Sequence, residues 1–272
     1  MNQGIDKENK LVNGLFKNQS QFNHVEKRFL ALAKEHNMSL DESKIEVKPV
    51  SSHDNKKYNH TWDCIVTDGN NSIGMSIKTN NNKTTKHPQH KSLIKHIFKQ
   101  NSSKQALWLD RFSNLAEKRA MDYLLKENPL AQTLKDVRKD KYNKTIAKVD
   151  KKLGAIYQEF FVQLFEEELL GKNNKDFLRF CFSSEKYIKI TWNKNNQFVI
   201  HDYLKLQELH DRVLTKVKFN PKNNNIELSF GDDLILVMRF KISFYKKHLI
   251  GSAVKGEINI KKLPDFIKEY KC

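Results

Sequence analysis

The sequence predicts a mixed α/β fold with a helical insertion in its middle and a β-rich C-terminal part. Segments rich in β-forming residues lie on both sides of the middle third, which itself carries apolar residues at helical spacing. The chain has 272 residues, of which 38% are hydrophobic, so it can bury a sizeable core. No run approaches the roughly 18 apolar residues that a membrane-spanning helix needs. The polar N-terminus and three widely spaced cysteines predict a cytoplasmic protein without a disulfide scaffold.

The N-terminal part is expected to contain a helix followed by strands. Apolar residues at helical spacing predict a helix over residues 21–35, and residues 45–47 predict a short strand. Residues 61–67 (TWDCIVT) and 72–79 (SIGMSIKT) are rich in β-formers and are separated by the turn residues Asp-Gly-Asn-Asn. These two segments give the clearest hairpin signal in the chain.

The middle of the chain is expected to be helical. Residues 106–126 form a long periodic segment, and residues 130–170 predict one or two further helices. An apolar stripe that includes Phe160, Phe161 and Phe165 follows one face of the second segment. Aromatic residues at this spacing are typical of a packed core rather than of a ligand site, so we expect the stripe to be buried.

The last third returns to segments of strand character. Strands are predicted at residues 187–192, 197–202, 216–219, 225–230, 234–243 and 255–260, with a helix at residues 204–213. No internal repeat or long linker interrupts the chain. We therefore expect one domain over residues 1–272, made of an N-terminal helix and hairpin (1–104), a helical insertion (105–175) and a β-rich part (176–272).

The chain carries 49 Lys and Arg residues against 32 Asp and Glu residues, which gives a net charge of +17. Of the basic residues, 42 are Lys and only 7 are Arg, a composition that A/T-rich codons also produce. The total charge is therefore weak evidence for a polyanionic partner. Residues 78–104 contain seven Lys and three His without one acid, and residues 234–255 contain Arg239 and four Lys without one acid. These two acid-free tracts predict a surface that contacts phosphates, and the alternative is two solvated lysine-rich faces.

Several enzyme classes lack their motifs in this sequence. It contains no Gly-rich phosphate loop, no Gly-x-Ser-x-Gly and no His-Glu-x-x-His. His87 and His90 stand three residues apart, but no cysteine lies near them, so we expect no zinc site there.

The predicted hairpin carries the candidate chemistry. Side chains alternate along a strand, so the apolar residues at alternate positions from Ile73 to Ile77 should face the core. Ser76 and Lys78 should then share the other face, where Asp63 of the first strand can approach Lys78. A carboxylate beside a lysine at the end of a hairpin suits metal-assisted phosphodiester hydrolysis. The carboxylate would hold Mg²⁺ against the phosphate, and the lysine would orient water or stabilise the developing charge.

This pair of strands resembles the PD-(D/E)xK nuclease motif, in which an Asp precedes an acid-x-Lys triplet on the adjoining strand. Asp63 matches the Asp, and Ser76-Ile77-Lys78 matches the triplet, with Ser76 in place of the second acid. The resemblance implies a PD-(D/E)xK nuclease core, which is a mixed central sheet flanked by helices. It also implies a catalytic site made of Asp63, Ser76 and Lys78.

The second acid of this motif should come from elsewhere in the chain. A hydroxyl such as that of Ser76 is a poorer Mg²⁺ ligand than a carboxylate. Asp63 is therefore expected to share the metal with another acid. Glu26 on the predicted helix is the preferred candidate, with Glu46 and Asp54 behind it.

A wider region resembles the HaeIII-like type II restriction endonucleases. The similarity lies in residues 73–80, followed by Lys86-His87-Pro88, and again in residues 236–242. It implies a Mg²⁺-dependent enzyme of the prokaryotic cytoplasm that cuts double-stranded DNA at a short specific sequence, GGCC in that family, and leaves 5′-phosphates. A palindromic target favours a homodimer, and a modification methyltransferase would be its functional partner.

The candidate DNA contacts lie in the two acid-free tracts. They are Asn80, Lys83, Lys86, His87, His90, Arg239 and Lys241. Arg is the usual partner of guanine in the major groove, and Arg is scarce here, which makes Arg239 more notable than any lysine. Arg239 and Lys241 should share one face of their strand, with Met238 and Phe240 on the other.

Two other functions stay open at this point. The same basic surface would serve a noncatalytic DNA- or RNA-binding protein, in which Ser76 marks a lost active site. A metal-dependent nuclease without sequence specificity would use the same residues as a restriction enzyme. The simplest structural role of Asp63, Lys78 and Arg239 is in ordinary ion pairs.

Overall fold

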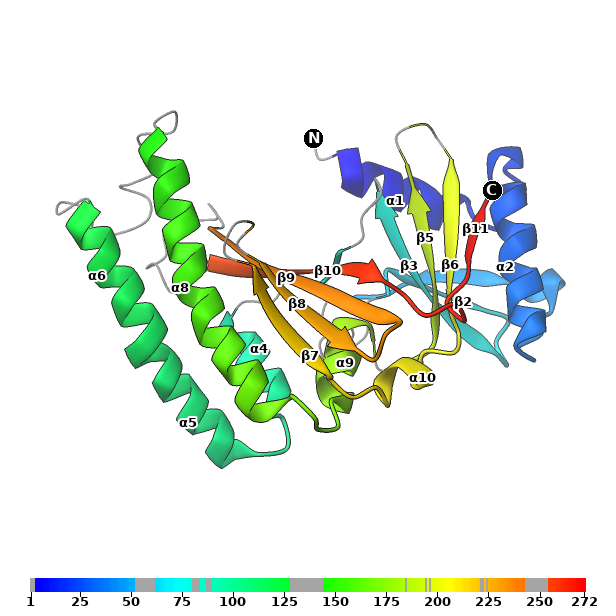
Figure 1. The fold of residues 1–272 in the computed structure, drawn as a ribbon. Helices are drawn as coiled ribbons and strands as arrows, with labels where there is room; N and C mark the ends of the chain where they lie inside the picture. The colour runs from blue at the N-terminus through cyan, green and yellow to red at the C-terminus, as the bar shows by residue number, and fades with distance from the viewer. Residues whose placement is uncertain are drawn as a thin grey trace. The chain divides into compact units, whose positions relative to one another are not determined.

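The computed structural model describes residues 3–51, 62–79, 84–86, 90–127, 144–183, 185–193, 195, 197–220, 223, 225–242 and 254–272. The chain forms two compact units, whose elements are labelled in Figure 1. Unit 1 comprises Met1–Lys83, Leu178–His210 and Pro264–Cys272, and unit 2 comprises Thr84–Phe177 and Asp211–Leu263. Unit 2 begins at Thr84, earlier than the insertion expected after residue 104, because residues 84–86 pair with a strand near the C-terminus.

Unit 1 is built on a six-stranded mixed sheet with the order β1-β2-β3-β5-β6-β11. The strands are β1 (Glu46–Pro49), β2 (Cys64–Thr67), β3 (Ser72–Thr79), β5 (Tyr187–Trp192), β6 (Phe198–Tyr203) and β11 (Glu269–Lys271). The expected hairpin is confirmed, because β2 and β3 pair in antiparallel register. β3 and β5 are the one parallel pair among the described strands of this sheet, and such a pair needs a long crossover connection.

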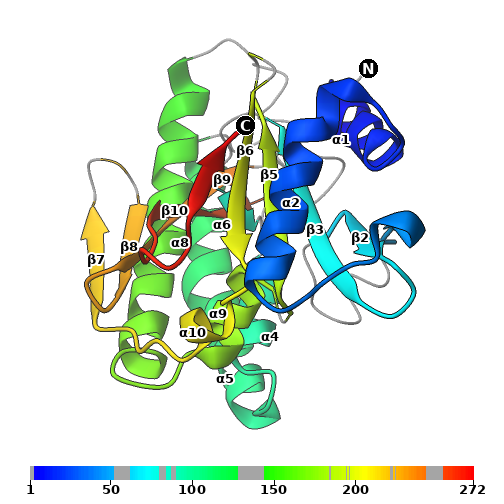
Figure 2. The same cartoon turned by 90° about the vertical axis from the view of Figure 1, so that its right-hand side faces the viewer.

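Helices cover one face of this sheet. They are α1 (Gln3–Gly14) and α2 (Asn23–Glu35), and Figure 2 shows α2 lying along the sheet. Ile73, Met75 and Ile77 of β3 are buried in the same core cluster as Phe29 of α2. The expected alternation is therefore confirmed: the apolar side chains of β3 face the core, and those of Ser76 and Lys78 lie on the opposite face.

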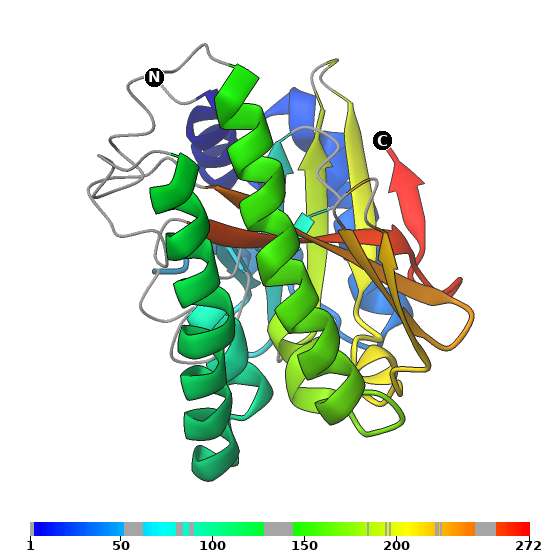
Figure 3. The same ribbon diagram turned by 60° about the vertical axis from the view of Figure 1, so that its left-hand side comes forward.

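Unit 2 contains a five-stranded antiparallel sheet with the order β4-β10-β9-β8-β7. Its strands are β4 (Thr84–Lys86), β7 (Lys216–Asn220), β8 (Asn225–Phe230), β9 (Leu234–Ile242) and β10 (Val254–Lys262). Its helices are α4 (His90–Ile97), α5 (Ser102–Phe112), α6 (Lys118–Glu127) and α8 (Lys144–Glu168). A π-helical turn at Ser113–Glu117 joins α5 to α6, and Figure 3 shows these helices running beside α8.

Aromatic side chains form the core between α8 and the sheet of unit 2. The rings of Phe161 and Phe240 stack with their centroids 4.8 Å apart. Phe160 meets Phe112 of α5 edge to face at 5.2 Å. The expectation that the aromatic stripe belongs to a core is confirmed, since Phe160, Phe161 and Phe165 are all buried.

Some elements differ from the sequence-based expectation. The helix expected at residues 204–213 is limited to α10 (Gln207–His210), because Val213 and Leu214 form β-bridges with Asn173 and Leu170, which follow α8. Further elements that the sequence patterns do not predict are α1, α4, β4, β11 and α9 (Lys175–Cys181). Most of these elements are too short to show a period. Among the described residues, no helix is long and apolar enough to cross a membrane.

Candidate active site

The hairpin of unit 1 brings Asp63 and Lys78 into direct contact. The N–H of Asp63 donates to the carbonyl of Met75 (2.8 Å), the residue that Cys64 faces at the end of the β2–β3 pairing, and so holds Asp63 against β3. The ammonium of Lys78 then reaches Asp63 Oδ2 at 3.0 Å. The approach of these two side chains that the sequence predicts is confirmed.

Asp63 is held by donors from three consecutive residues of β3. Its Oδ2 accepts the backbone N–H of Ile77 (2.5 Å) and the hydroxyl of Ser76 (3.3 Å), besides the ammonium of Lys78. The side chains of Asp63 and Lys78 are each 29% exposed, so the pair is accessible from solvent. Among the described residues these contacts all use Oδ2.

The residue before Asp63 packs against a glycine of the neighbouring strand. A Cβ atom on Gly74 would lie 2.1 Å from Cε2 of Trp62, far closer than two carbon atoms approach. The indole therefore occupies the place of a side chain at position 74. This contact fixes the backbone at Trp62 and, through it, the direction in which Asp63 leaves the strand.

Glu8 of α1 is a carboxylate that interacts electrostatically with both hairpin residues. Burial raises the pKa of Glu8, while the charge of Lys78 lowers it and that of Asp63 raises it further. Glu8 therefore lies within electrostatic reach of both hairpin residues. Sequence reasoning missed Glu8 because helix α1, which carries it, was not predicted. The signal available was weak, since Leu11 and Leu15 are the buried apolar residues of that segment.

The acids expected from the sequence have other partners. Glu26 of α2 accepts the backbone N–H of Phe16 on Oε1 at 2.6 Å, which ties it to the chain that follows α1. Glu46 of β1 forms an exposed ion pair with Lys48 at 2.9 Å. Asp54 lies outside the described residues. Of the described acids, Glu8 is the one whose interaction with both Asp63 and Lys78 is evident.

A row of polar side chains crosses the sheet beside this site. Lys189 of β5 lies opposite Ser76 in parallel register, His201 of β6 lies opposite Lys189, and Glu269 of β11 lies opposite His201. Oε1 of Glu269 is 3.1 Å from Nδ1 of His201. Burial lowers the pKa of Lys189 to about 8, with Lys78 adding to this effect and Glu269 opposing it. Sequence reasoning missed this row, because nothing in the sequence fixes the register of β5 on β3.

The expected DNA contacts are only partly described. Asn80, Lys83 and His87 lie outside the described residues, and so do the side chains of Lys86, His90 and Lys241. Arg239 of β9 is exposed, opposite Glu257 of β10. Met238 and Phe240 are buried, so the expected division between the two faces of β9 is confirmed for the described side chains.

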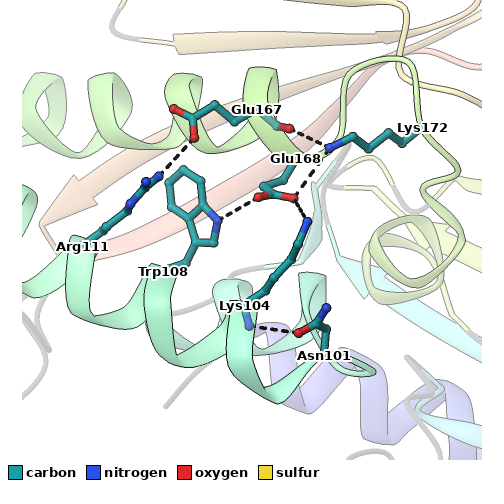
Figure 4. A network of polar contacts seen from close by, with 7 residues as sticks. All are labelled: Asn101, Lys104, Trp108, Arg111, Glu167, Glu168 and Lys172. Atoms are coloured by element: carbon teal, nitrogen blue, oxygen red, sulfur yellow. Dashed lines mark hydrogen bonds and ion pairs between the residues drawn. The ribbon is translucent and has the colours of Figure 1, made fainter.

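Two lysines of the first acid-free tract pair with acids from later in unit 2. Lys91 contacts Glu117 at 3.0 Å, and Lys104 contacts Glu168 at 2.6 Å. Figure 4 shows that Glu168 also accepts the indole N–H of Trp108, while Arg111 contacts the neighbouring Glu167. The tract is therefore free of acids in sequence but not in space, and part of its charge is neutralised within the protein.

The donors at the candidate site fit a cation that needs few protein ligands. Among the described residues, no cluster of three or more His, Cys, Asp or Glu could hold a metal ion. Asp63 and Glu8 are two carboxylates that share one electrostatic environment. Mg²⁺ is usually bound through one or two carboxylates and keeps several waters, so this pair suits it better than it suits zinc.

Comparison of the chain with protein-family models, with curated proteins and with solved structures finds no match. The interpretation of the site therefore rests on its residues and their geometry.

Proposed function

We propose that this protein is a Mg²⁺-dependent endonuclease for double-stranded DNA, of the PD-(D/E)xK class. The observation that carries the proposal is the 3.0 Å contact between Lys78 and Asp63 at the end of an antiparallel hairpin in a mixed sheet. The resemblance to HaeIII-like enzymes makes a type II restriction endonuclease the specific form of the proposal. Its target would be a short sequence such as GGCC.

Each residue of the site has a distinct role in this chemistry. Asp63 and Glu8 would hold the divalent cation, which stabilises negative charge on the phosphate when it is bound. Lys78 presents an ammonium that can orient the attacking water and stabilise the charge that develops on phosphate oxygens. The hydroxyl of Ser76 helps to hold the Asp63 carboxylate in place.

The reaction is the hydrolysis of a phosphodiester. The oxygen of water forms a bond to phosphorus, the bond from phosphorus to O3′ breaks, and O3′ takes up a proton. The products are a 5′-phosphate and a 3′-hydroxyl. This outcome needs no redox partner and no covalent intermediate on the protein.

The charge of the chain supports a polyanionic partner. A net charge of +17 favours association with DNA, and the exposed Arg239 of β9 is suited to a base or a phosphate. A two-fold symmetric DNA target would be matched by a homodimer. In a restriction system a methyltransferase would protect the host DNA at the same sequence.

Digestion of long duplex DNA with Mg²⁺ tests the proposal. Discrete bands support a restriction enzyme, a smear indicates a nuclease without sequence specificity, and shifted but intact DNA indicates a noncatalytic binder. Asp63→Asn and Lys78→Met should each reduce cleavage on the order of 100-fold or more. Lys48→Met, which removes an exposed lysine from the same sheet, serves as the matched control. Undiminished cutting by both site variants would overturn the assignment.

A further inference from the structure

The six-stranded sheet of unit 1 has two edge strands, β1 and β11, which differ in how they are protected (Figure 1). In β1, the N–H of Val50 donates to the carbonyl of Asp63, so the alternation of the ladder turns the backbone of Pro49 outward. Proline on an outer edge offers no N–H to a further strand. β11 contains no proline, and its register on β6 is regular. The edge formed by β11 therefore lacks the protection found on β1.

The backbone of β11 directs two residues away from the sheet. Cys272 and Phe198 exchange both of their backbone hydrogen bonds, at 2.9 and 3.2 Å. Because hydrogen-bonded pairs alternate along an antiparallel ladder, the N–H and C=O groups of Glu269 and Lys271 point away from β6. Within the part of the chain that the structure describes, these backbone groups have no hydrogen-bond partner.

The charges of this edge complement themselves. The side chain of Glu269 contacts His201 but remains 60% exposed, and Lys271 is exposed as well. In an antiparallel pairing with a second copy centred on Tyr270, each Glu269 lies directly opposite Lys271 of the copy. A pairing centred on Glu269 or on Lys271 instead places like charges opposite each other, which is unfavourable. The charges therefore favour one register of this edge on a second copy of itself.

We propose that the β11 edge binds the β11 edge of a second copy of this chain, about a two-fold axis at Tyr270. Glu269 and Lys271 then exchange both backbone hydrogen bonds on each side of the axis, and the two six-stranded sheets become continuous. An axis that relates antiparallel neighbours is perpendicular to the sheet, so both Asp63–Lys78 pairs lie on the same face. The use of these two sites to cut both strands of one duplex rests on the proposed function, whereas the dimer itself does not.

Sedimentation equilibrium without DNA measures the association. The wild type should reach twice the 32.0 kDa of one chain. Lys271→Glu, which places two acids opposite each other on each side of the axis, should weaken association about 10-fold or more. Lys268→Glu makes the same charge change at an exposed residue whose backbone lies on the β6 side, and it should associate as the wild type does.

A mixture of two variants distinguishes an interface from a structural effect within one chain. Lys271→Glu mixed with Glu269→Lys should associate as a heterodimer, because each acid then lies opposite a lysine. Glu269→Lys also loses the contact with His201, so circular dichroism first establishes that this variant is folded. The disulfide experiment that follows does not depend on it.

A disulfide tests the register. At the axis the two Tyr270 Cα atoms would be about 4.5 Å apart, within the range of a disulfide, whereas the two Lys268 Cα atoms would be about 14 Å apart. In a Cys272→Ser background, Tyr270→Cys should therefore form a linked dimer under mild oxidation, and Lys268→Cys should not. The remaining cysteines, Cys64 and Cys181, are buried.

The outcomes separate this proposal from the nuclease proposal. A monomeric wild type, a Lys271→Glu protein that associates as tightly as the wild type, or equal crosslinking at positions 268 and 270 would overturn the interface. If a monomer cuts DNA, the interface fails and the nuclease proposal stands. If the protein dimerises through β11 but cuts no DNA, the nuclease proposal fails and the interface stands.

Discussion

The indole of Trp62 and the backbone of Gly74 lie in contact across the β2–β3 hairpin, where a Cβ atom on residue 74 would fall 2.1 Å from the ring. Trp62 immediately precedes Asp63, the carboxylate that Lys78 contacts. Glycine at position 74 is thus required by close approach rather than by a turn. This contact links the packing of the hairpin to the position of its catalytic candidate.

Gly74→Ala should therefore destabilise the protein by about 1–3 kcal/mol, the usual range for overpacking a dense core. It should also reduce DNA cleavage, because displacement of Trp62 moves Asp63. Urea denaturation and cleavage assays measure the two effects. In a Trp62→Ala background the same glycine substitution should have little further effect on stability, and equal effects in both backgrounds would contradict the contact.

Glu8→Gln should reduce cleavage on the order of 100-fold, because it removes the charge of the carboxylate proposed to share the cation with Asp63. Glu46→Gln, at an exposed ion pair of β1, is the matched control and should leave cleavage unchanged. If Glu26→Gln abolished cleavage while Glu8→Gln did not, the acid of the site would be Glu26.

The stability of the Glu8 variant should also depend on pH. Burial raises the pKa of Glu8 in the folded protein above its usual 4.5, so folding disfavours the charged form. This penalty is absent below the usual pKa and develops as pH rises through the raised value. Denaturation at pH 4 and pH 7 should therefore show Glu8→Gln gaining stability relative to the wild type at the higher pH.

Lys189→Met should be more stable than the wild type at neutral pH. The pKa of Lys189 is about 8 in the folded protein, below its usual 10.5. At 1.36 kcal/mol per pKa unit, this difference lowers the free energy of unfolding of the wild type by about 3 kcal/mol below pH 8. The sign is fixed because the unfolded chain binds the proton more tightly than the folded one. Stability of the wild type should recover between pH 8 and 10.5. The stability difference between variant and wild type, measured by urea denaturation at pH 7 and pH 10, should accordingly shrink.

Glu168→Ala should destabilise unit 2 by about 1–3 kcal/mol, because it leaves the buried indole N–H of Trp108 without this acceptor. Burial tends to raise the pKa of Glu168, but the hydrogen bonds from Lys104 and Trp108 prevail and lower it. The contribution of Glu168 is therefore present above pH 4.5 and is lost as pH falls through the lowered pKa. Glu166→Ala, at an exposed position of the same helix, is the control, and an equal loss in both variants would contradict this prediction.

Local sequence patterns predicted the strands that local runs of β-forming residues determine. The residues of β3, β5 and β8 match their predicted segments, because each is a short run of β-formers bounded by turn residues. The helix α1 and the three-residue strands β4 and β11 were not predicted, since α1 has few apolar residues and such short strands show no period. Their stability comes from tertiary pairing and packing rather than from local propensity.

The sequence by itself determined the hairpin, the alternation of side chains on β3, and so the meeting of Asp63 with Lys78 across two neighbouring strands. Only the tertiary structure decided which residues join them. The packing of α1 brings Glu8 within electrostatic range of Asp63 and Lys78, and the parallel register of β5 on β3 brings Lys189 opposite Ser76. The physical reason is the separation of the paired strands along the chain. A hairpin fixes its own register through a short turn. The parallel strands β3 and β5 are separated by about a hundred residues, so their register depends on tertiary packing that local sequence does not specify.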